Sequence, residues 1–252
     1  QDLRGMDITS TTIRGADLSY TNLEGQDLSK MDLRGINFTG ANLKDVNFTG
    51  AIFSKTIQVA GDCTDENAII NVMKNFKCIS IVVKNEEIRT NFTNADLTNA
   101  KFGIKDAGIY NQMVYFVDFT NADLTNVDLY GVQFFGSDFT NAKLNGISGK
   151  QIFIVESNFT NSEMNDFKIS EAWIQSTLFY NSDMKNGSFD SITFINLDFS
   201  GTDFDGTDFM LLNEIGDNSS WFDLNDLSDT GIMLLNEIGV NNYSCKNNII
   251  CN

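Results

Sequence analysis

The decapeptide NFTNADLTNA, residues 91–100, consists of two five-residue units, and each unit carries a large apolar residue in its second place. The same letters contain Asn91-Phe92-Thr93, which has the Asn-x-Thr pattern of an N-glycan acceptor and would place the protein outside a cytosol. If the five-residue rhythm extends along the chain, Asn and Thr belong to the repeat. The sequon is then no independent sign of secretion, so the extent of the rhythm has to be established first.

The rhythm runs through the first 53 residues without exception. A smaller or apolar residue, such as Ala41 or Val46, usually stands two places before each large one, and the other three places are polar. Neither a helix, with a period of 3.6, nor a strand, with a period of 2.0, has period five. Each unit is predicted to point two side chains inward and three outward. The large apolar residues are Leu3, Ile8, Ile13, Leu18, Leu23, Leu28, Leu33, Phe38, Leu43, Phe48 and Phe53.

A second period of twenty residues appears in the later part of the chain. Segments such as DFTNADL at 118, DFTNAKL at 138 and NFTNSEM at 158 resemble one another. Four units therefore make one turn, and one phenylalanine per turn stacks on an inner face, with an Asn column at the adjoining corner. The predicted core ladder is Phe119, Phe139, Phe159, Phe179 and Phe199, and the corner column is Asn121, Asn141, Asn161 and Asn181.

The register of the rhythm is interrupted in two places. Phe92, Leu97 and Phe102 follow one register, and a second register begins at Ile104 and Ile109. That second register lapses once, at Gly149. A square solenoid is the simplest shape that satisfies both the five-residue and the twenty-residue period.

The units ADLSY, ANLKD, ADLTN and AKLNG resemble the A-(D/N)-L-x-x repeats of the pentapeptide-repeat family, over about 175 residues. The resemblance implies that family's fold, an all-β solenoid in the form of a right-handed quadrilateral β-helix. About nine coils spaced about 4.8 Å apart would give a rod about 40 Å long. The chain departs from the family pattern, because many central residues are Phe, Ile or Met rather than Leu.

Four segments are expected. Coils cover 1–55 and 91–209, an α/β insert covers 56–90, and a non-repeat C-terminal cap covers 210–252. In the insert, TDENAIINVMKNF reads as a short helix capped by Thr64, and CISIVV reads as a strand. In the cap, MLLNEIG occurs at 210 and at 233, and its apolar side chains are expected to cover the last coil.

Four cysteines allow three disulfide pairings, and the preferred one joins Cys63 with Cys78 and Cys245 with Cys251. A straight helix over all the intervening residues would hold Cys63 and Cys78 about 20 Å apart, beyond bridging range. If the helix ends by about Met73, the chain can fold back and a bridge is feasible. Four reduced thiols are the alternative.

Composition argues against several classes of function. The net charge is −17, from 34 acids and 17 bases, so a direct electrostatic grip on nucleic acid or anionic lipid is not expected. The sequence contains no His and no Pro, and no apolar run is long enough to insert in a bilayer. The start at Gln1 is compatible with a processing site or with a fragment boundary.

No catalytic residues, cofactor or metal site are expected. The sequence lacks a Gly-x-Ser-x-Gly element, a phosphate-binding loop and metal-type Cys spacing, and no carboxylate pair can be singled out. DFDGTD and DLNDLSD gather oxygen ligands. Counted from Asp223, however, Ser228 and Leu234 stand where a calcium-binding EF-hand loop needs Gly and Glu. These segments are read as solvated turns.

Seven sequons are glycosylation candidates, and in the first four the Asn and Thr flank an inward Phe and therefore face outward. With the cysteines, they favour an extracellular or cell-surface location, and a cytoplasmic repeat protein is the alternative. The candidates are Asn37, Asn47, Asn91, Asn158, Asn186, Asn218 and Asn242.

The expected function is that of a non-catalytic structural or interaction scaffold, which binds protein partners or copies of itself. Solenoids usually cap their ends, and the first coil shows no lid in this sequence. A missing upstream segment or simple fraying is one explanation, and end-to-end association of copies into oligomers or filaments is the other. The alternative comes from the family resemblance. Some members have DNA-like charge and bind type II topoisomerases, and the acidity of this chain fits that function.

Overall fold

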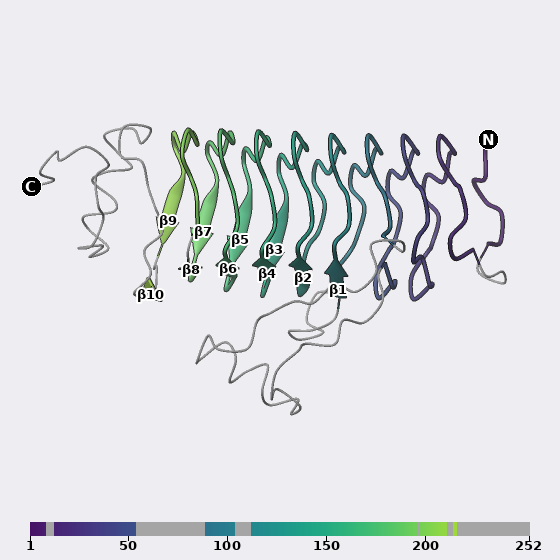
Figure 1. The fold of residues 1–252 in the computed structure, drawn as a ribbon, viewed down its shortest axis with the longest axis horizontal. Coiled ribbons are helices and arrows are strands. Elements are labelled where there is room, and N and C mark those ends of the chain that lie inside the picture. The colour runs from purple at the N-terminus through teal and green to yellow at the C-terminus, as the bar shows by residue number, and fades with distance from the viewer. Residues whose placement is uncertain (9–12, 54–88, 104–111, 196, 211–213, 216–252) are drawn as a thin grey trace, which may run out of the picture.

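The computed structural model describes residues 1–8, 13–53, 89–103, 112–195, 197–210 and 214–215. These residues form a rod of stacked coils, which Figure 1 shows side by side from the N-terminal end to strand β9. All the pairing between coils is parallel. No helix in this described part is long and apolar enough to cross a membrane.

Each coil has four sides, and each side contributes one rung to a column that runs along the rod. On face A the bridges link nine rungs, from Asp2 through Asn22 and Asn42 to Asp203. Face B follows with the column that contains Asp27, Asn47 and Lys101, and face D contains Asp17, Asn37 and Asn91. Successive rungs on one face usually lie twenty residues apart, as the sequence predicts, so the expected quadrilateral solenoid is confirmed.

Face C and the later part of face B form continuous sheets. Face C consists of β1 (Gln112–Tyr115), β2 (Val132–Phe135), β4 (Phe153–Val155), β6 (Trp173–Gln175), β8 (Thr193–Ile195) and β10 (Glu214–Ile215). Face B carries β3 (Ser148–Lys150), β5 (Lys168–Ser170), β7 (Ser188–Asp190) and β9 (Asp208–Met210). Faces A and D are held by single bridges, each followed by a tight turn.

The turns explain why Asn and Gly recur at fixed places. The second residue after each central apolar residue has a positive φ, as at Asn121 (55°), Asn141 (57°) and Asn161 (57°). This left-handed region suits Gly, and Asn is the side-chain-bearing residue most enriched there. The predicted Asn corner column is therefore confirmed, and Asn94 and Asn99 occupy equivalent corners with φ of 56° and 58°.

The core is a stack of side chains in the middle of the rod. Buried residues alternate with half-buried ones in the predicted pattern of two inward and three outward positions. All five predicted ladder phenylalanines are buried, and successive rings lie 4.4–5.0 Å apart between centroids. The stack continues through Phe92 to Phe38, each step again 5.1 Å. These two rings were not assigned to this ladder from the sequence.

Two interruptions explain the shift of register. Asn37 pairs with Asn91, 54 residues later, and Asn91 pairs with Asp118, 27 residues later, instead of after twenty. The first interruption lies between Phe53 and Arg89, and the second between Gly103 and Gln112. Ile104 and Ile109, expected as core rungs, lie outside the described residues.

Buried polar side chains seal the core at both interruptions. The Thr90 hydroxyl donates to the carbonyl oxygens of Leu33 (2.9 Å) and Phe53 (2.7 Å). The Gln112 side-chain amide donates to the Ala51 carbonyl (2.6 Å). A buried carbonyl without a donor is costly, so these bonds supply partners where the regular ladder is broken.

Glycines inside the rod are matched by large neighbours. A Cβ at Gly149 would lie 2.2 Å from Cδ1 of Ile152, so Ile152 fills the central position where the apolar rhythm lapses. A Cβ at Gly187 would lie 2.0 Å from Cε1 of Phe167, whose ring occupies that space. Large and small residues therefore alternate between coils to keep the interior filled.

The α/β insert expected at 56–90 and the cap expected at 210–252 lie almost entirely outside the described residues. The same is true of the helix capped by Thr64 and of the CISIVV strand. The division of the chain into these segments therefore stays a prediction.

Candidate interaction surface

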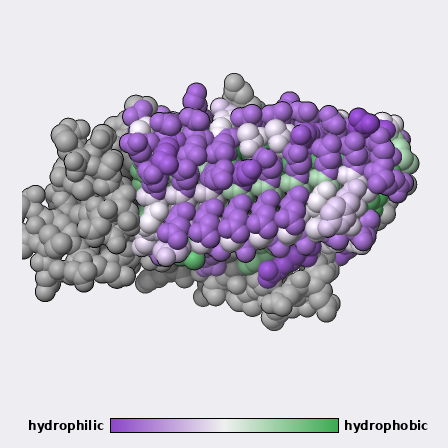
Figure 2. Space-filling model, turned by 90° about the horizontal axis from the view of Figure 1, so that it is seen from above, coloured by the Kyte–Doolittle hydropathy of each residue, from purple (hydrophilic) through white to green (hydrophobic). Residues whose placement is uncertain are grey.

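The outward side chains form two parallel rows on each face, one before and one after the buried central residue. Rungs of parallel strands repeat about every 4.8 Å, so each row presents side chains at nearly constant spacing. Figure 2 shows these rows as hydrophilic bands along the rod. The chemistry of this protein is therefore displayed on ladders rather than gathered in one cluster.

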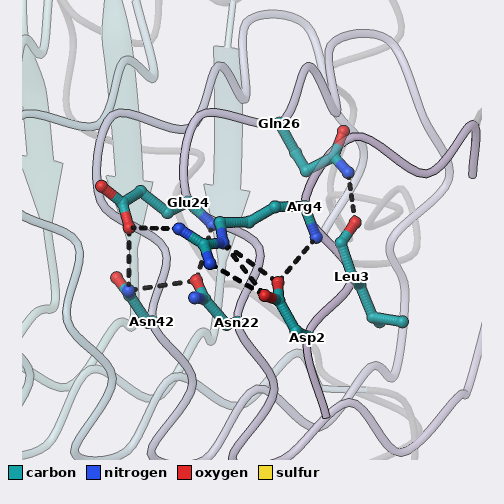
Figure 3. A network of polar contacts seen from close by, with 7 residues as sticks. All are labelled: Asp2, Leu3, Arg4, Asn22, Glu24, Gln26 and Asn42. Carbon is teal, nitrogen blue, oxygen red and sulfur yellow. Dashed lines mark hydrogen bonds and ion pairs between the residues drawn. The ribbon is translucent and has the colours of Figure 1, made fainter.

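Face A begins with a network that links three coils, drawn in Figure 3. Arg4 donates to Asp2 from Nε (3.0 Å) and from Nη2 (2.8 Å), and its Nη1 lies 3.9 Å from Glu24 Oε2. In the next coils, Asn42 Nδ2 donates to Asn22 Oδ1 at 3.1 Å. The bonds from Arg4 lower the pKa of Asp2 to about 2, so this carboxylate stays charged well into acid.

Lysines neutralise part of the acidity further along face A. Lys44 pairs with Asp96 at 3.2 Å, and Lys185 contacts both Asp183 (3.1 Å) and Asp203 (3.0 Å). The hydrogen bonds that Lys185 donates to Asp203 and Asp183 raise its pKa. These exposed pairs add little stability each, but they balance charge along the face.

Face D has a different composition, because neither of its outward rows contains Lys or Arg. The first row has acids at Asp17, Asp118, Asp138 and Asp198, and the second is mostly Ser or Thr. The Asp138 carboxylate accepts the N–H and the hydroxyl of Thr140 at 3.0 and 2.6 Å. The hydrogen bonds from Ser19 lower the pKa of Asp17. Face D is therefore a flat, acidic, hydroxyl-rich surface.

One rung of face D breaks this pattern. Leu178 and Tyr180 occupy the outward positions that hold Asn158 and Thr160 in the previous coil, and each is 46% exposed. Neither residue was predicted from the sequence as part of a site. Comparison of LFYNSDM with NFTNSEM could have done so, since the Leu and Tyr replace polar letters at outward places.

Five of the seven sequon asparagines lie in the described residues. On face D, Asn37 donates to Asp17 Oδ1 (3.1 Å) and Asn158 donates to Thr140 Oγ1 (2.9 Å), and on face B Asn47 donates to Asp27 Oδ1 (3.1 Å). Their amides thus belong to the ladders, while Asn186 stands exposed at a corner. Asn91, on face D, is half-buried. Asn218 and Asn242 lie outside the described residues.

The remaining predicted residues bear on covalent or metal chemistry. Cys63, Cys78, Cys245 and Cys251 all lie outside the described residues, as does the DLNDLSD segment. In DFDGTD, the Asp203 carboxylate pairs with Lys185. Among the residues that the structure describes, no group of three or more acidic, Cys or His side chains could hold a metal ion.

Comparison with known proteins places the repeat in a family. The family model described as pentapeptide repeats matches in eight copies, over residues 16–54, 115–148 and 175–209. No curated protein sequence matches the chain.

Several solved structures are similar to this chain. One is HetL, a pentapeptide repeat protein involved in heterocyst differentiation regulation from the cyanobacterium Nostoc. It shares 16% identity and a TM-score of 0.40, and the match covers 86% of this chain and 82% of HetL. Another is trypsin-treated QnrB1, a plasmid-mediated fluoroquinolone resistance protein, with 14% identity, a TM-score of 0.31 and coverage of 78% and 84%.

A third is Rfr23, a pentapeptide repeat protein from the cyanobacterium Cyanothece, with 11% identity, a TM-score of 0.18 and coverage of 75% and 86%. Because these TM-scores and identities are low, the solved structures are not used to assign the family. The assignment rests on the repeat in the sequence and on the coils that it forms. The repeats matched by the family model form four-sided coils with a filled core and Asn or Gly corners. Over these residues the chain carries pentapeptide repeats.

Proposed function

We propose that this protein is a non-catalytic scaffold, extracellular or surface-exposed, which binds protein partners or further copies of itself. The observation that carries the proposal is the arrangement of the side chains. The interior is filled by a continuous stack of apolar rings, and the polar groups stand outside in rows of fixed spacing. Such rows suit many weak contacts with an extended partner, because each rung repeats the same geometry.

Catalysis would need a different arrangement of the same residue types. A general acid or base works within hydrogen-bond reach of a bound substrate, in a site that excludes water. Asp2, Asp17 and Asp27 instead lie on outer faces and accept hydrogen bonds from the residue two places further on in the same coil. Their pKa values are lowered by such bonds, which suits a fixed charge better than proton transfer near neutral pH.

Self-association is tested most sharply at the apolar rung of face D. In the double variant Leu178→Asp with Tyr180→Thr, that rung acquires the residue types of its neighbours, so the fold should be retained. If copies meet side by side through this rung, sedimentation equilibrium gives a mass above one chain for the parent protein and the mass of one chain for the variant.

The other outcomes of this experiment are equally informative. If the variant stays associated, the contact between copies lies outside this rung, as it would in end-to-end assembly. A parent protein with the mass of one chain at all working concentrations refutes self-association. Lys143→Ala, an exposed change on face A, is the matched control and should leave the mass unchanged.

The extracellular location rests on the sequons and the cysteines. Among the described sequons, Asn186 is the most accessible acceptor, because its side chain is exposed at a corner. Intact mass of the native material before and after deglycosylation tests this part. A mass equal to that of the bare chain, with four free thiols, would favour the cytoplasmic alternative.

The second candidate is a DNA-mimicking protein that binds a type II topoisomerase. The net charge of −17 and the acidic row of face D, whose outward rows hold no Lys or Arg, favour it. The charge density argues against it. Four aspartates over seven intervals of about 4.8 Å give this row one charge per about 8 Å, against one per about 3.4 Å along a single strand of DNA. A gyrase supercoiling assay tests it, since no inhibition at micromolar protein would remove this candidate.

A further inference from the structure

Two large apolar side chains stand side by side on the otherwise polar face D. Leu178 and Tyr180 are each 46% exposed, whereas the other outward residues of this face from Asn37 to Asp198 are half-buried. The two side chains that water solvates least well are therefore the two that protrude most. This apolar rung is the feature of face D that the ladder of polar residues does not explain.

The solenoid beneath the apolar rung holds it in place. The Leu178 N–H donates to the Ser157 carbonyl of the previous coil at 3.0 Å. Phe179, between the two exposed residues, is buried, and its ring lies 5.0 Å from that of Phe199 in the next coil. A partner therefore meets a preformed surface, which lowers the entropy that is lost on binding.

Acidic side chains flank the apolar rung along the same row. Asp198 pairs with Leu178 on the next rung, and Asp138 stands two rungs before it. At about 4.8 Å per rung, they lie about 5 Å and about 10 Å from Leu178 along the rod. Oδ1 of each carboxylate accepts the N–H of the residue two places further on, at 3.0 Å for Asp138 and 2.9 Å for Asp198. The negative charges are thus held at fixed places on both sides of the rung.

Face D has no basic side chain of its own to balance these acids. Its two outward rows hold no Lys or Arg, whereas face A carries Lys44 and Lys185, face B carries Lys168 and face C carries Arg34. A positively charged partner is therefore attracted to this face. Two copies that met through face D would bring two acidic rows together, and each chain has a net charge of −17, so charge disfavours a second copy as the occupant.

We propose that the apolar rung and the acids beside it form a docking site for a cationic segment of a protein partner, in which Lys or Arg flank an aromatic or aliphatic side chain. The apolar side chain of the partner packs on Leu178. Its cations lie against Asp138 and Asp198, or over the Tyr180 ring, whose face attracts positive charge. This inference rests on the proposed scaffold function and names the class of partner. A mimic of DNA would use charge alone, so the need for an apolar side chain distinguishes the two.

Fluorescence anisotropy with two peptides tests the site in the full chain. The probe is the fluorescein-labelled peptide KKFKK, and the comparison peptide KKGKK has the same charge but lacks the ring. The parent protein should bind KKFKK at least fivefold more tightly than KKGKK, because the ring packs on an exposed, preformed anchor. Both affinities should fall as the salt concentration is raised, since the flanking charges are exposed to solvent.

A first pair of substitutions removes the apolar contact and leaves the charge unchanged. Leu178→Asn with Tyr180→Thr gives the rung the residue types that Asn158 and Thr160 supply in the previous coil, so the fold should be retained. This variant should bind KKFKK no more tightly than KKGKK.

A second pair removes the flanking charge. Asp138→Asn with Asp198→Asn introduces a residue type that the same row already holds, for example at Asn158, and should weaken the binding of both peptides about threefold or more. Asp128→Asn with Asp208→Asn removes the same charge from face B and is the matched control. It should change either affinity less than twofold.

Three outcomes would overturn the inference. Equal affinity of the parent protein for the two peptides would show binding by charge alone, and an equal loss in the face B control would show that face D is not the site. If the parent protein sediments above the mass of one chain and the Leu178→Asn, Tyr180→Thr variant sediments as one chain, a second copy occupies the rung, and the scaffold function stands without this inference. A parent protein that binds neither peptide and sediments as one chain contradicts both the inference and the scaffold function.

Discussion

Replacement of Phe159 by Ala tests the stacked core directly. Phe159 is 2% exposed, and its ring lies 4.4 Å from that of Phe139 and 5.0 Å from that of Phe179. The substitution opens a cavity between two rings that are held by their own coils, so the neighbours cannot collapse into it. Losses for Phe→Ala in a packed core are about 3–5 kcal/mol. The total stability of a domain is typically about 5–15 kcal/mol, so the loss is a large fraction of it.

Urea denaturation followed by far-ultraviolet circular dichroism measures this loss. With a slope of about 3 kcal/mol per molar urea, the midpoint should fall by about 1 M or more. Phe159→Leu should lose less, because most of the space stays filled. Lys143→Ala, exposed in the same coil region, should stay within about 0.5 kcal/mol of the parent. A loss below about 1 kcal/mol for Phe159→Ala would refute the placement of this ring between its neighbours.

Three further changes probe other parts of the rod. Gly187→Ala should destabilise the fold by about 1–3 kcal/mol, because its Cβ would lie 2.0 Å from the ring of Phe167. Phe167→Leu, added to the Gly187→Ala variant, should restore stability. Equal urea midpoints for the parent and the single variant would contradict this packing. Thr90→Val keeps the shape but removes the hydroxyl that donates to the Phe53 carbonyl, so it should lower stability by about 1–3 kcal/mol in the same assay. A neutral result would show that this carbonyl does not depend on the Thr90 hydroxyl. Hydrogen bonds from Arg34 lower the pKa of Asp32 below its unfolded value. This pair therefore stabilises the fold above about pH 4, and its effect is lost as the pH falls further. Arg34→Met should reduce the dependence of the urea midpoint on acid pH, and an unchanged dependence would show that the pair contributes nothing.

The periods of five and twenty predict most of the rod because both follow from local backbone geometry. A central apolar residue such as Phe139 must point inward, and Asn141 suits a corner with positive φ whatever surrounds it. The same periods explain why the ladder phenylalanines and the Asn column were assigned correctly from residue 119 onward.

Spacing alone could not show how many residues separate successive rungs of one face. Ile104 and Ile109 continue the five-residue rhythm up to Val114, so they read as rungs, whereas Asn91 pairs with Asp118 across seven additional residues. For the same reason Phe92 was not joined to the later phenylalanine ladder. The similarity of NFTNADL at 91 to DFTNADL at 118 could have shown that Phe92 belongs to the same ladder as Phe119.

The outer surfaces were the least predictable part. The rhythm distinguishes inward from outward positions, but it does not tell whether an outward residue meets water. Phe153 and Trp173 both occupy outward places. The sequence did not show that they are neighbours, whereas in the structure they pair on the adjacent strands β4 and β6. The candidate interaction rung, Leu178 with Tyr180, was overlooked for the same reason.

The central claim is that coils separated by long stretches of sequence stack directly on one another. Double electron–electron resonance tests it, with spin labels at Asn37→Cys and Asp198→Cys after the four native cysteines are replaced by Ser. The labels stand on the same outward row of face D, six intervals apart. Directly stacked coils give a narrow distance distribution centred at about 29 Å. If residues 54–88 formed two coils of their own within the rod, the distance would be about 38 Å, and that result would contradict it.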